Sequence, residues 1–276
     1  MRPMSVAGKI VVITGGARGI GLATAGVLHG LGAKVAIGDV DKPAARGAAS
    51  RLGLELHGRL DVTQRRSFSN FLDTVEDQLG PIDVLVNNAG VIAVGNAIDE
   101  ADAVTKRLLD VNVYGVILGT KLAAERMVPR GHGHIINIAS VGGLQPTAGI
   151  ATYCATKHAV LGFTDTVRME NRGSGVHFSA VLPTLTNTEM IAGIGHATGL
   201  RNAEPEEVAN AVAGLIAKPK RRVVVPRSMG VVLQSQRFVP QRVSEALGRA
   251  LGTERVFSSD VDVTKRKSYA DRTGTS

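Results

Sequence analysis

The sequence predicts an α/β fold built on one doubly wound, parallel β-sheet of about seven strands with helices on both faces. Three observations support this prediction. Short apolar runs alternate strictly with helical patterns, which is typical of parallel sheets with helical crossovers. The first run, 9–14, is almost wholly apolar, as expected for a strand buried on both faces. The length of 276 residues also fits a single large α/β domain.

Each apolar run can be given its place in the chain order. The first strand is expected over 9–14 and the second over 34–39, each followed by a helix (19–31, then one opened near Pro43). A weaker third strand, 54–60, comes next. The remaining elements alternate as a helix over 64–79, a strand over 82–86, a long helix over about 99–127, a strand over 134–139, a helix over 151–171, a strand over 176–182, a helix over 204–217 and a strand over 222–225. Right-handed crossovers should place ligands beyond the carboxyl ends of these strands.

The domain organisation is expected to be simple. One domain covers 1–252, and its last part, 226–252, is predicted to be a basic helical extension. Residues 253–276 carry mixed charge and few apolar side chains, so we expect a polar, mobile tail. Between positions 218 and 249, eight basic residues stand against one acid, so the net charge of +8 is mostly local. A solvated basic face is the favoured interpretation, with an anionic partner or a membrane surface as the alternative.

The composition favours a soluble, cytoplasmic protein. No apolar run reaches the ~18–20 residues that a membrane-spanning helix needs. No apolar segment of the kind found in signal peptides precedes the first strand. Cys154 is the only cysteine, so the chain forms no intrachain disulfide and suits a reducing compartment.

A glycine-rich turn joins the first strand to the first helix. Its glycines are Gly15, Gly19 and Gly21, a spacing that differs from the common G-x-G-x-x-G. Such a turn lets the backbone approach a pyrophosphate, and the free N–H groups at the helix start favour its charge. An ordinary tight turn would produce the same pattern, so the glycines alone are a weak signal.

Asp39 strengthens the prediction of a dinucleotide site. It ends the second strand, 18 residues after Gly21, close to the ~20-residue separation at which an acid meets the adenosine ribose. A carboxylate there accepts hydrogen bonds from a 2′-hydroxyl and repels a 2′-phosphate, which favours NAD over NADP. The alternative is that Asp39 and Asp41 only cap a turn. Arg18 is the one nearby group that could help to tolerate a phosphate.

Tyr153 and Lys157 lie four residues apart on a predicted helix and so project from one face. A tyrosine hydroxyl has an ordinary pKa of ~10, which is too high for a good base near neutrality. A neighbouring ammonium, and the positive ring of an oxidised nicotinamide, would both favour the phenolate. Taken alone, the pair would more often be a simple contact on a helix surface.

The motifs occur together and in order: the glycine turn from Thr14 to Gly21, Asn87-Asn-Ala-Gly90, Asn112, Ser140 and Tyr153-x-x-x-Lys157. This set resembles the short-chain dehydrogenase/reductase family, over roughly residues 8–225. The resemblance implies a Rossmann-like fold and catalysis of hydride transfer. It also implies that Tyr153 is the general acid/base and that Ser140 orients the substrate oxygen. Lys157 would then lower the Tyr153 pKa and hold the nicotinamide ribose, and Asn112 would support a water in a proton relay.

The same resemblance implies a cofactor-binding set. Its members are Gly15, Arg18, Gly19, Ile20, Gly21, Asp39, Asp61, Val62, Asn88, Ala89, Gly90, Tyr153, Lys157, Pro183, Thr186 and Thr188. Thr188 would bind the nicotinamide carboxamide. Where the family more often has a glycine after Pro183, this chain has Thr184, which puts the local backbone geometry in doubt.

The substrate is expected to be a small, lipophilic alcohol or ketone. The segments beside Ser140 and Tyr153 contain apolar residues and no lysine or arginine to hold a carboxylate; the apolar ones are Ile92, Val94, Leu144, Met190, Ile191 and Ile194. The glycine-containing loop near 188–203 is read either as a lid that orders on binding or as an ordinary surface loop.

The favoured function is therefore an NAD-dependent oxidoreductase acting on CH–OH groups. An NAD(P)-sensing regulatory or scaffold protein without turnover is the alternative, and a basic peripheral or nucleic-acid-binding protein is the weakest hypothesis. We expect no metal site, because His132 and His134 have no further ligand at suitable spacing. A homo-oligomer, either a dimer or a homotetramer, is expected, and the helical stripe in 226–252 favours subunit packing or pocket cover over membrane contact.

Overall fold

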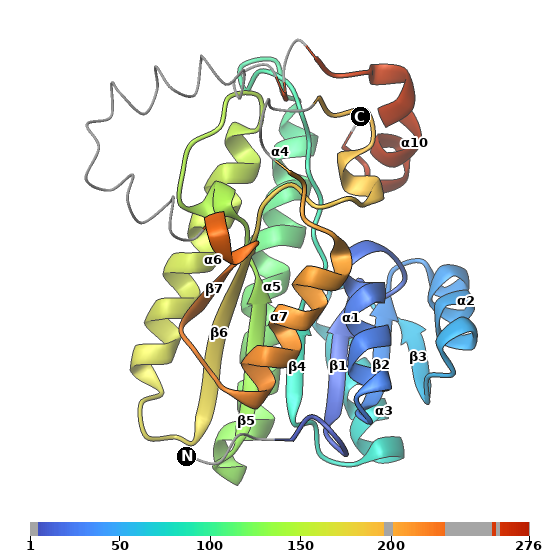
Figure 1. Ribbon diagram of the computed structural model, residues 1–276, viewed down its shortest axis with the longest axis vertical. Helices are drawn as coiled ribbons and strands as arrows, with labels where there is room; N and C mark the ends of the chain where they lie inside the picture. The colour runs from blue at the N-terminus through green and yellow to red at the C-terminus, as the bar shows by residue number, and fades with distance from the viewer. Residues whose placement is uncertain (1–4, 196–200, 230–255, 258–259, 276) are drawn as a thin grey trace.

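The computed structural model describes residues 5–195, 201–229, 256–257 and 260–275. Its centre is one parallel sheet in the order β3-β2-β1-β4-β5-β6-β7 (Figure 1). The strands are β1 (Ile10–Thr14), β2 (Lys34–Asp39), β3 (Leu56–Arg59), β4 (Val84–Asn87), β5 (Gly133–Ile138), β6 (Val176–Pro183) and β7 (Arg222–Val225). The predicted fold class, with seven strands in one doubly wound sheet, is confirmed.

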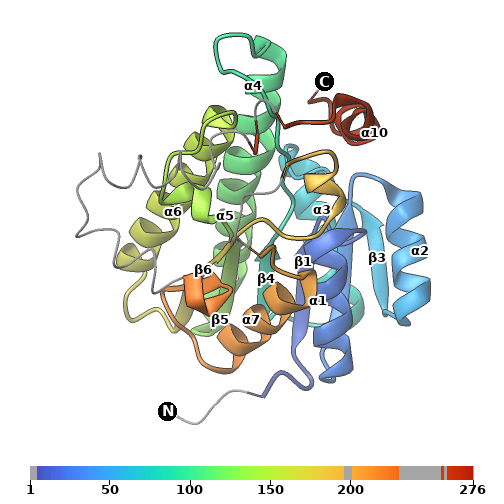
Figure 2. The same cartoon turned by 45° about the horizontal axis from the view of Figure 1, so that its top comes forward.

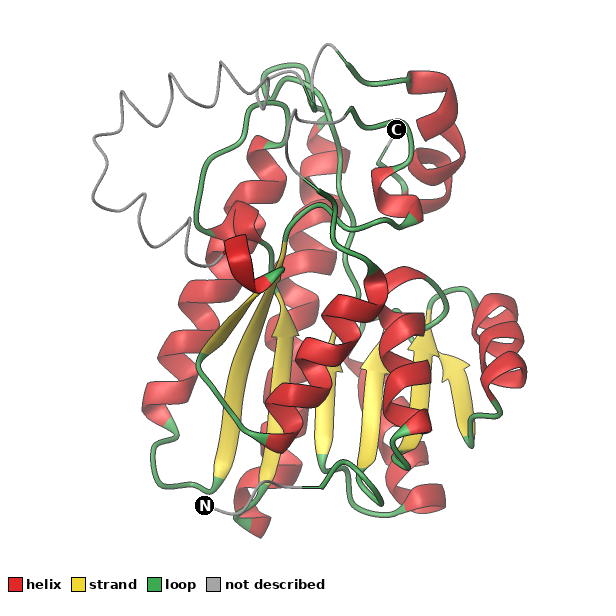
Figure 3. Cartoon of the chain, in the orientation of Figure 1, coloured by secondary structure: helices red, strands yellow, loops and turns green. Residues whose placement is uncertain are grey.

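Helices cover both faces of the sheet, as Figure 3 shows by colour. They are α1 (Gly19–Gly30), α2 (Lys42–Leu52), α3 (Arg65–Leu79), α4 (Asp102–Leu109), α5 (Gly115–Met127), α6 (Ala151–Glu170), α7 (Pro205–Ala217) and α10 (Val263–Thr273). The first, second and seventh helices lie on one face, and the third to sixth lie on the other (Figure 1).

The two faces follow from the alternation of side chains along a strand. In β1, Val11 and Ile13 join the apolar cluster that contains α1 and α7, whereas Ile10 and Val12 join the cluster beneath α3 and α5. All four are buried. Because both faces of β1 pack against helices, nearly all of its side chains are apolar. This continuous apolar run is what allowed the strand to be predicted from the sequence.

The long helix expected over about 99–127 is continuous in the structure but not regular. α4 passes through a π-helical turn, Asp110–Tyr114, before α5 begins. Such turns widen a helix locally and often occur at functional sites. Here the turn contains Asn112, whose side chain is fully buried beneath the pocket described below.

Residues 263–273 correct one expectation. The sequence predicts a polar, mobile tail there, but the structure forms α10, which begins at the capping residue Asp262. One face of α10 is buried through Arg266, Tyr269 and Ala270. The expectation fails because Arg266 is buried by hydrogen bonds to the backbone carbonyls of Met190 and Ile92. The composition of the segment gives no sign of such distant contacts. Figure 2 places α10 above the β1 side of the sheet, beyond the strand ends.

Several expectations fall wholly or partly outside the described residues. These are positions 230–252 of the predicted basic extension, positions 253–255, 258–259 and 276 of the predicted tail and positions 196–200 of the predicted lid. Among the helices that the structure describes, none combines the length and apolar character needed to cross a membrane.

Candidate active site

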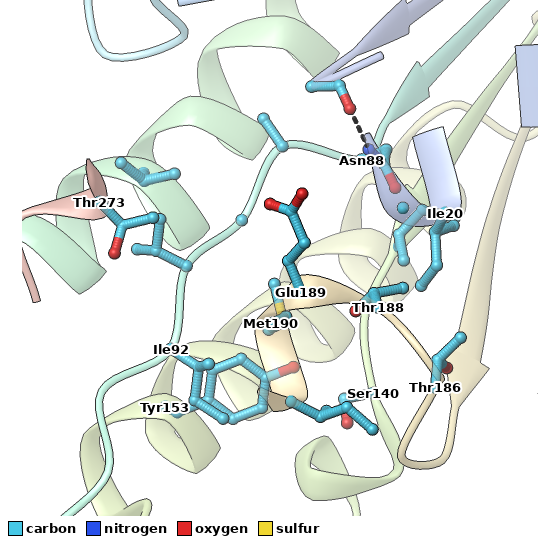
Figure 4. A pocket seen from close by; sticks show the side chains of 18 of the residues that line it. Ile20, Asn88, Ile92, Ser140, Tyr153, Thr186, Thr188, Glu189, Met190 and Thr273 are labelled. Atoms are coloured by element: carbon cyan, nitrogen blue, oxygen red, sulfur yellow. Dashed lines mark hydrogen bonds between the residues drawn. The ribbon is translucent and has the colours of Figure 1, made fainter. Parts of the chain in front are cut away.

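The carboxyl ends of the central strands open into a pocket with a volume of about 340 Å³. This size lies within the range of small-molecule sites. Figure 4 shows side chains that line it. Of the predicted site residues, all but two line this pocket: Gly15, Arg18, Gly19, Ile20, Asp39, Asp61, Val62, Asn88, Ala89, Gly90, Ser140, Tyr153, Lys157, Pro183, Thr186 and Thr188. The two that do not, Gly21 and Asn112, lie behind its wall.

The glycine turn is required by its geometry. Gly15 and Gly19 have φ values of +63° and +51°, in the left-handed region that side chains disfavour. A Cβ atom on Gly21 would lie 2.2 Å from the carbonyl oxygen of Gly15, so any larger residue would force the turn apart. Arg18 occupies the N-cap position of α1 without a side-chain cap bond. Gly19 and Ile20, the first residues of α1, line the pocket, and the uncapped N-terminus of a helix suits an anion.

Asn88 holds the glycine turn from the neighbouring strand end. Its Nδ2 donates to the carbonyl oxygens of Thr14 and Gly15 at 2.9 and 3.0 Å. In return, Thr14 Oγ1 accepts the backbone N–H groups of Asn88 and Ala89, both at 3.0 Å. These four bonds join the end of β1 to the end of β4 and hold the turn in place.

Asp39 and Asp41 have separate tasks. Asp41 caps α2 by accepting the Ala44 N–H at 3.0 Å, and it also accepts a 2.6 Å hydrogen bond from Arg18. Arg18, followed by the Ala44 N–H, holds the pKa of Asp41 below its ordinary value. Asp39 accepts the backbone N–H groups of Ala17 and Asp41 at 3.2 and 3.1 Å. These bonds fix its carboxylate in the pocket wall, and the bond from the Asp41 N–H also caps the turn after β2, as the alternative expected.

The segment after β6 forms the opposite wall. Thr188 lies over the glycine turn, since a Cβ on Gly19 would be 3.1 Å from its methyl group. Thr186 is buried and donates to the Thr184 carbonyl at 3.0 Å. No non-glycine residue in the described part of the chain has a positive φ, so Thr184 keeps an ordinary backbone despite replacing a glycine. Its N–H donates to Val225 at 2.9 Å.

Tyr153, Ser140 and Lys157 meet at the floor of the pocket. Figure 4 shows the Tyr153 hydroxyl and Ser140 directed into the same space. Ser140 Oγ accepts the Gly142 N–H at 3.1 Å and hydrogen-bonds to Tyr153. Lys157, almost fully buried, donates to the Ile138 carbonyl at 3.0 Å, and its Nζ lies 5.5 Å from the Tyr153 ring centroid. The predicted trio is therefore brought together.

Burial controls the protonation of both groups. It lowers the pKa of Lys157 from 10.5 to about 8, so the ammonium is still mostly charged at neutral pH. Burial also raises the pKa of Tyr153 above its ordinary value, while the hydrogen bond with Ser140 acts in the opposite direction. Lys157 is not among the causes of this shift, so the expectation that Lys157 lowers the Tyr153 pKa stays a prediction.

Asn112 lies directly behind this floor. Its Oδ1 accepts the Val91 N–H and its Nδ2 donates to the Val91 carbonyl, both at 2.8 Å. Nδ2 also donates to Thr156 Oγ1 at 3.2 Å, on the helix that carries Tyr153. Asn112 therefore ties the loop after β4 to α6 at the level of the catalytic side chains.

The apolar part of the pocket was only partly foreseen. Of the predicted substrate-side residues, Ile92, Met190 and Ile191 line it, whereas Val94, Leu144 and Ile194 do not. Among the residues that sequence reasoning missed are Ile150, Phe257, Tyr269, Glu189, Arg107 and Arg272. The last two bring arginines from segments that the prediction did not consider. Tyr269 and Arg272 belong to α10, whose charge-rich sequence gave no signal of a pocket wall.

Two other buried polar residues do not line the pocket. Cys154, next to Tyr153, is buried, and burial raises the pKa of its thiol. His134 is buried in β5 with a ring nitrogen 2.8 Å from Ser179 Oγ, and burial lowers its pKa to about 3. Both are packed polar groups that the chemistry of the pocket does not need.

Comparisons with known proteins agree with this geometry. A family model described as short chain dehydrogenase matches residues 9–199. A 3-alpha-(or 20-beta)-hydroxysteroid dehydrogenase of Mycobacterium tuberculosis is 38% identical over 213 residues, covering 75% of this chain and 82% of that protein. Estradiol 17-beta-dehydrogenase 11 of Mus musculus is 32% identical over 251 residues, covering 88% and 84%. A short chain dehydrogenase/reductase from Burkholderia phymatum, solved in complex with NAD, gives a TM-score of 0.78 at 26% identity and covers 85% of this chain and 95% of that one.

Proposed function

Because the chain belongs to the short-chain dehydrogenase/reductase family, we propose that it is an NAD-dependent oxidoreductase that interconverts a lipophilic alcohol and its ketone, with Tyr153 as general acid/base. The observation that carries the proposal is the meeting of Tyr153, Ser140 and Lys157 at the floor of a pocket whose other end is the glycine turn. A dinucleotide bound at the glycine turn would extend along this pocket toward Tyr153, which can exchange a proton with a substrate bound there.

The chemistry divides between the cofactor and the chain. When bound, the nicotinamide accepts or supplies the hydride. In the oxidation direction, Tyr153 Oη removes the proton of the substrate hydroxyl as the C–H bond loses its hydride, so that a carbonyl forms. Ser140 Oγ holds the same oxygen in place. In the reduction direction, Tyr153 returns the proton to the carbonyl oxygen. Such positioned proton transfer typically contributes a rate factor of about 10²–10⁴.

Because the pKa of Tyr153 is raised, its phenolate, the form that acts as the base, needs nearby positive charge to stabilise it. Lys157 supplies one charge from the next turn of α6. An oxidised nicotinamide would add a second, so the phenolate forms best when the cofactor is in place. Asn112, which joins the loop after β4 to α6, is proposed to support the water through which Lys157 exchanges protons with solvent.

The proposed preference for NAD depends on Asp39. Its carboxylate is fixed in the pocket wall by two backbone N–H groups and is positioned to accept hydrogen bonds from a ribose 2′-hydroxyl. A 2′-phosphate would bring negative charge against Asp39 and Asp41. Arg18, the cation that contacts Asp41 directly, is already paired with it. The residues present therefore fit NAD better than NADP.

The substrate side supports a lipophilic alcohol. The apolar residues Ile92, Ile150, Met190 and Phe257 line the pocket near Tyr153. Two of the similar proteins are named as dehydrogenases of hydroxysteroids or estradiol, which are bulky and lipophilic. We propose a substrate of that class in a cytoplasmic homo-oligomer, either a dimer or a homotetramer. A cofactor-sensing protein without turnover is the competing function.

The test is a panel of lipophilic secondary alcohols, hydroxysteroids included, assayed by the reduction of NAD and of NADP. We expect turnover with NAD, and Tyr153→Phe should lower kcat by at least about 10²-fold while NAD affinity is kept. Tyr114→Phe is the matched control, because Tyr114 is exposed outside the pocket. Equal turnover in Tyr153→Phe would exclude this mechanism. NAD binding without turnover on any alcohol would favour the sensing function.

A further inference from the structure

Three charged side chains meet at the mouth of the pocket, from segments far apart in sequence. Glu189, just after Thr188, is one of the residues that line the pocket (Figure 4). Arg272 of α10 contacts Glu189 Oε2 through Nη2 at 2.6 Å, and Arg18 Nε lies 3.8 Å from the same oxygen. One carboxylate oxygen therefore holds two guanidinium groups over the start of α1.

This place in the fold is the one where a dinucleotide's phosphates belong. Gly19 and Ile20, at the start of α1, line the pocket, and a helix N-terminus favours an anion. A negative Glu189 beside a pyrophosphate would repel it. Arg18 is already paired with Asp41 at 2.6 Å, so Arg272 is the cation at the mouth whose recorded ion pair is with Glu189 alone.

α10 holds Arg272 in this position. Arg266 is buried and donates to the carbonyls of Met190 and Ile92 at 3.0 and 2.9 Å, so it fastens the helix to two pocket loops. Tyr269 Oη accepts the Ile92 N–H at 3.2 Å, and the Arg272 guanidinium lies 5.7 Å from the centroid of its ring. The Arg272 guanidinium is therefore presented by a helix that is docked on both sides of the pocket, rather than by a free chain end.

We propose that Arg272 is a cofactor-binding residue, which contacts the pyrophosphate of the dinucleotide from above while the start of α1 contacts it from below. Glu189 is the partner that this arginine exchanges for phosphate. The inference rests on the proposed binding of a nicotinamide dinucleotide and adds to it a phosphate contact from the C-terminal helix. Arg272 presents its donors in a planar fork that matches phosphate oxygens.

The experiment measures the affinity of the full-length chain for NAD, ADP-ribose and adenosine by calorimetry. The variants are Arg272→Gln, Arg272→Lys, Glu189→Gln and the Arg272→Gln/Glu189→Gln pair. Lys267→Gln is the matched control, since it removes one positive charge from the exposed side of the same helix. Melting temperatures establish that each variant remains folded.

We expect Arg272→Gln to weaken NAD and ADP-ribose binding about 10-fold, as for the loss of one charged hydrogen bond, and to leave adenosine binding within about twofold. Arg272→Lys should recover part of the loss, because the charge is kept. Glu189→Gln should tighten ADP-ribose binding, because a repelling charge is removed. Lys267→Gln should bind like the wild type.

The double variant separates a phosphate contact from simple neutralisation of Glu189. If Arg272 contacts phosphate, its replacement weakens ADP-ribose binding in the Glu189→Gln background as well. If the loss disappears in that background, or if adenosine binding falls equally, the inference is wrong while the proposed function stands. A wild-type chain that binds neither NAD nor ADP-ribose would overturn the proposed function and this inference together.

Discussion

The floor and the mouth of the pocket are built on opposite principles. At the floor, Lys157 and Asn112 are almost completely buried and are held by regular elements through short hydrogen bonds. At the mouth, the side chains of Arg272 and Glu189 are 36% and 55% exposed and come from segments 83 residues apart. Buried polar groups cost stability unless fully paired, whereas exposed ion pairs contribute little. Burial of the Lys157 charge at the floor therefore costs stability, whereas the exposed ion pair at the mouth can be broken at little cost.

The sharpest way to break this comparison is Lys157→Met. We expect kcat to fall by at least about 10²-fold and the pH profile of alcohol oxidation to move to higher pH, because the charge that favours the phenolate is lost. Steady-state kinetics from pH 6 to 10 measure both effects.

The same variant should be more stable than the wild type at neutral pH. The pKa of Lys157 is about 8 in the folded chain against 10.5 when exposed, so the folded state resists the charged form. That penalty is full below pH 8 and fades as pH rises to 10.5. After allowance for the lost bond to Ile138, we expect a gain of about 1–3 kcal/mol at pH 7, which urea unfolding would measure. A Lys157→Met variant less stable than the wild type would contradict the stability cost that we assign to burial of the Lys157 charge.

Asn112→Ala tests the second buried group. It leaves the N–H and the carbonyl of Val91 unpaired in a buried site, at a cost of about 3 kcal/mol in the free energy of unfolding. Asn70→Ala is the control, because Asn70 is exposed on α3. Equal losses in the two variants, measured by urea unfolding, would show that burial is not the cause.

His134 extends the comparison to a buried polar group outside the pocket. Its folded pKa of about 3 lies below the ordinary 6.5, so stability is complete above pH 6.5 and falls as pH drops toward 3. The fall approaches about 1.4 kcal/mol per pH unit for this residue. His134→Gln should remove that component between pH 6.5 and 4.5, whereas exposed His132→Gln should not. Parallel stability profiles for His134→Gln and the wild type would contradict this.

The smallest effect is expected at the mouth. Arg272→Gln should change the free energy of unfolding by less than about 1 kcal/mol, because the pair is solvent-exposed. Urea unfolding at low and moderate salt measures this, and a loss that persists at moderate salt would mean that Arg272 belongs to the structural core.

Sequence reasoning reached the floor more easily than the mouth, for a physical reason. The helical spacing of Tyr153 and Lys157 makes that pair recognisable in the sequence, and the position of Asp39 at a strand end does the same for this acid. Arg272 and Tyr269 do not, since their roles depend on a docked helix rather than on local pattern. The docking rests on Arg266, whose carbonyl partners lie 76 and 174 residues away. Neither the amino-acid composition nor the hydrophobic periodicity of a segment reveals contacts with residues so far away in the sequence.

Asn112 stands between these cases. The resemblance marked the residue as functional, but its pairing with Val91 and the π-helical turn that aims it inward emerge only from the packed structure. The apolar wall is similar, since Ile92 was predicted from its place in the chain whereas Phe257 lies beyond the region that the resemblance covers.

Cys154 gives the molecule a built-in reporter. It is the only thiol in the chain and lies next to Tyr153 on α6, buried and with its pKa raised. An alkylating reagent can therefore reach it mainly when the packing around this part of α6 opens. The rate at which Cys154 is alkylated in the wild-type chain would therefore measure how often α6 opens locally, with and without bound nucleotide.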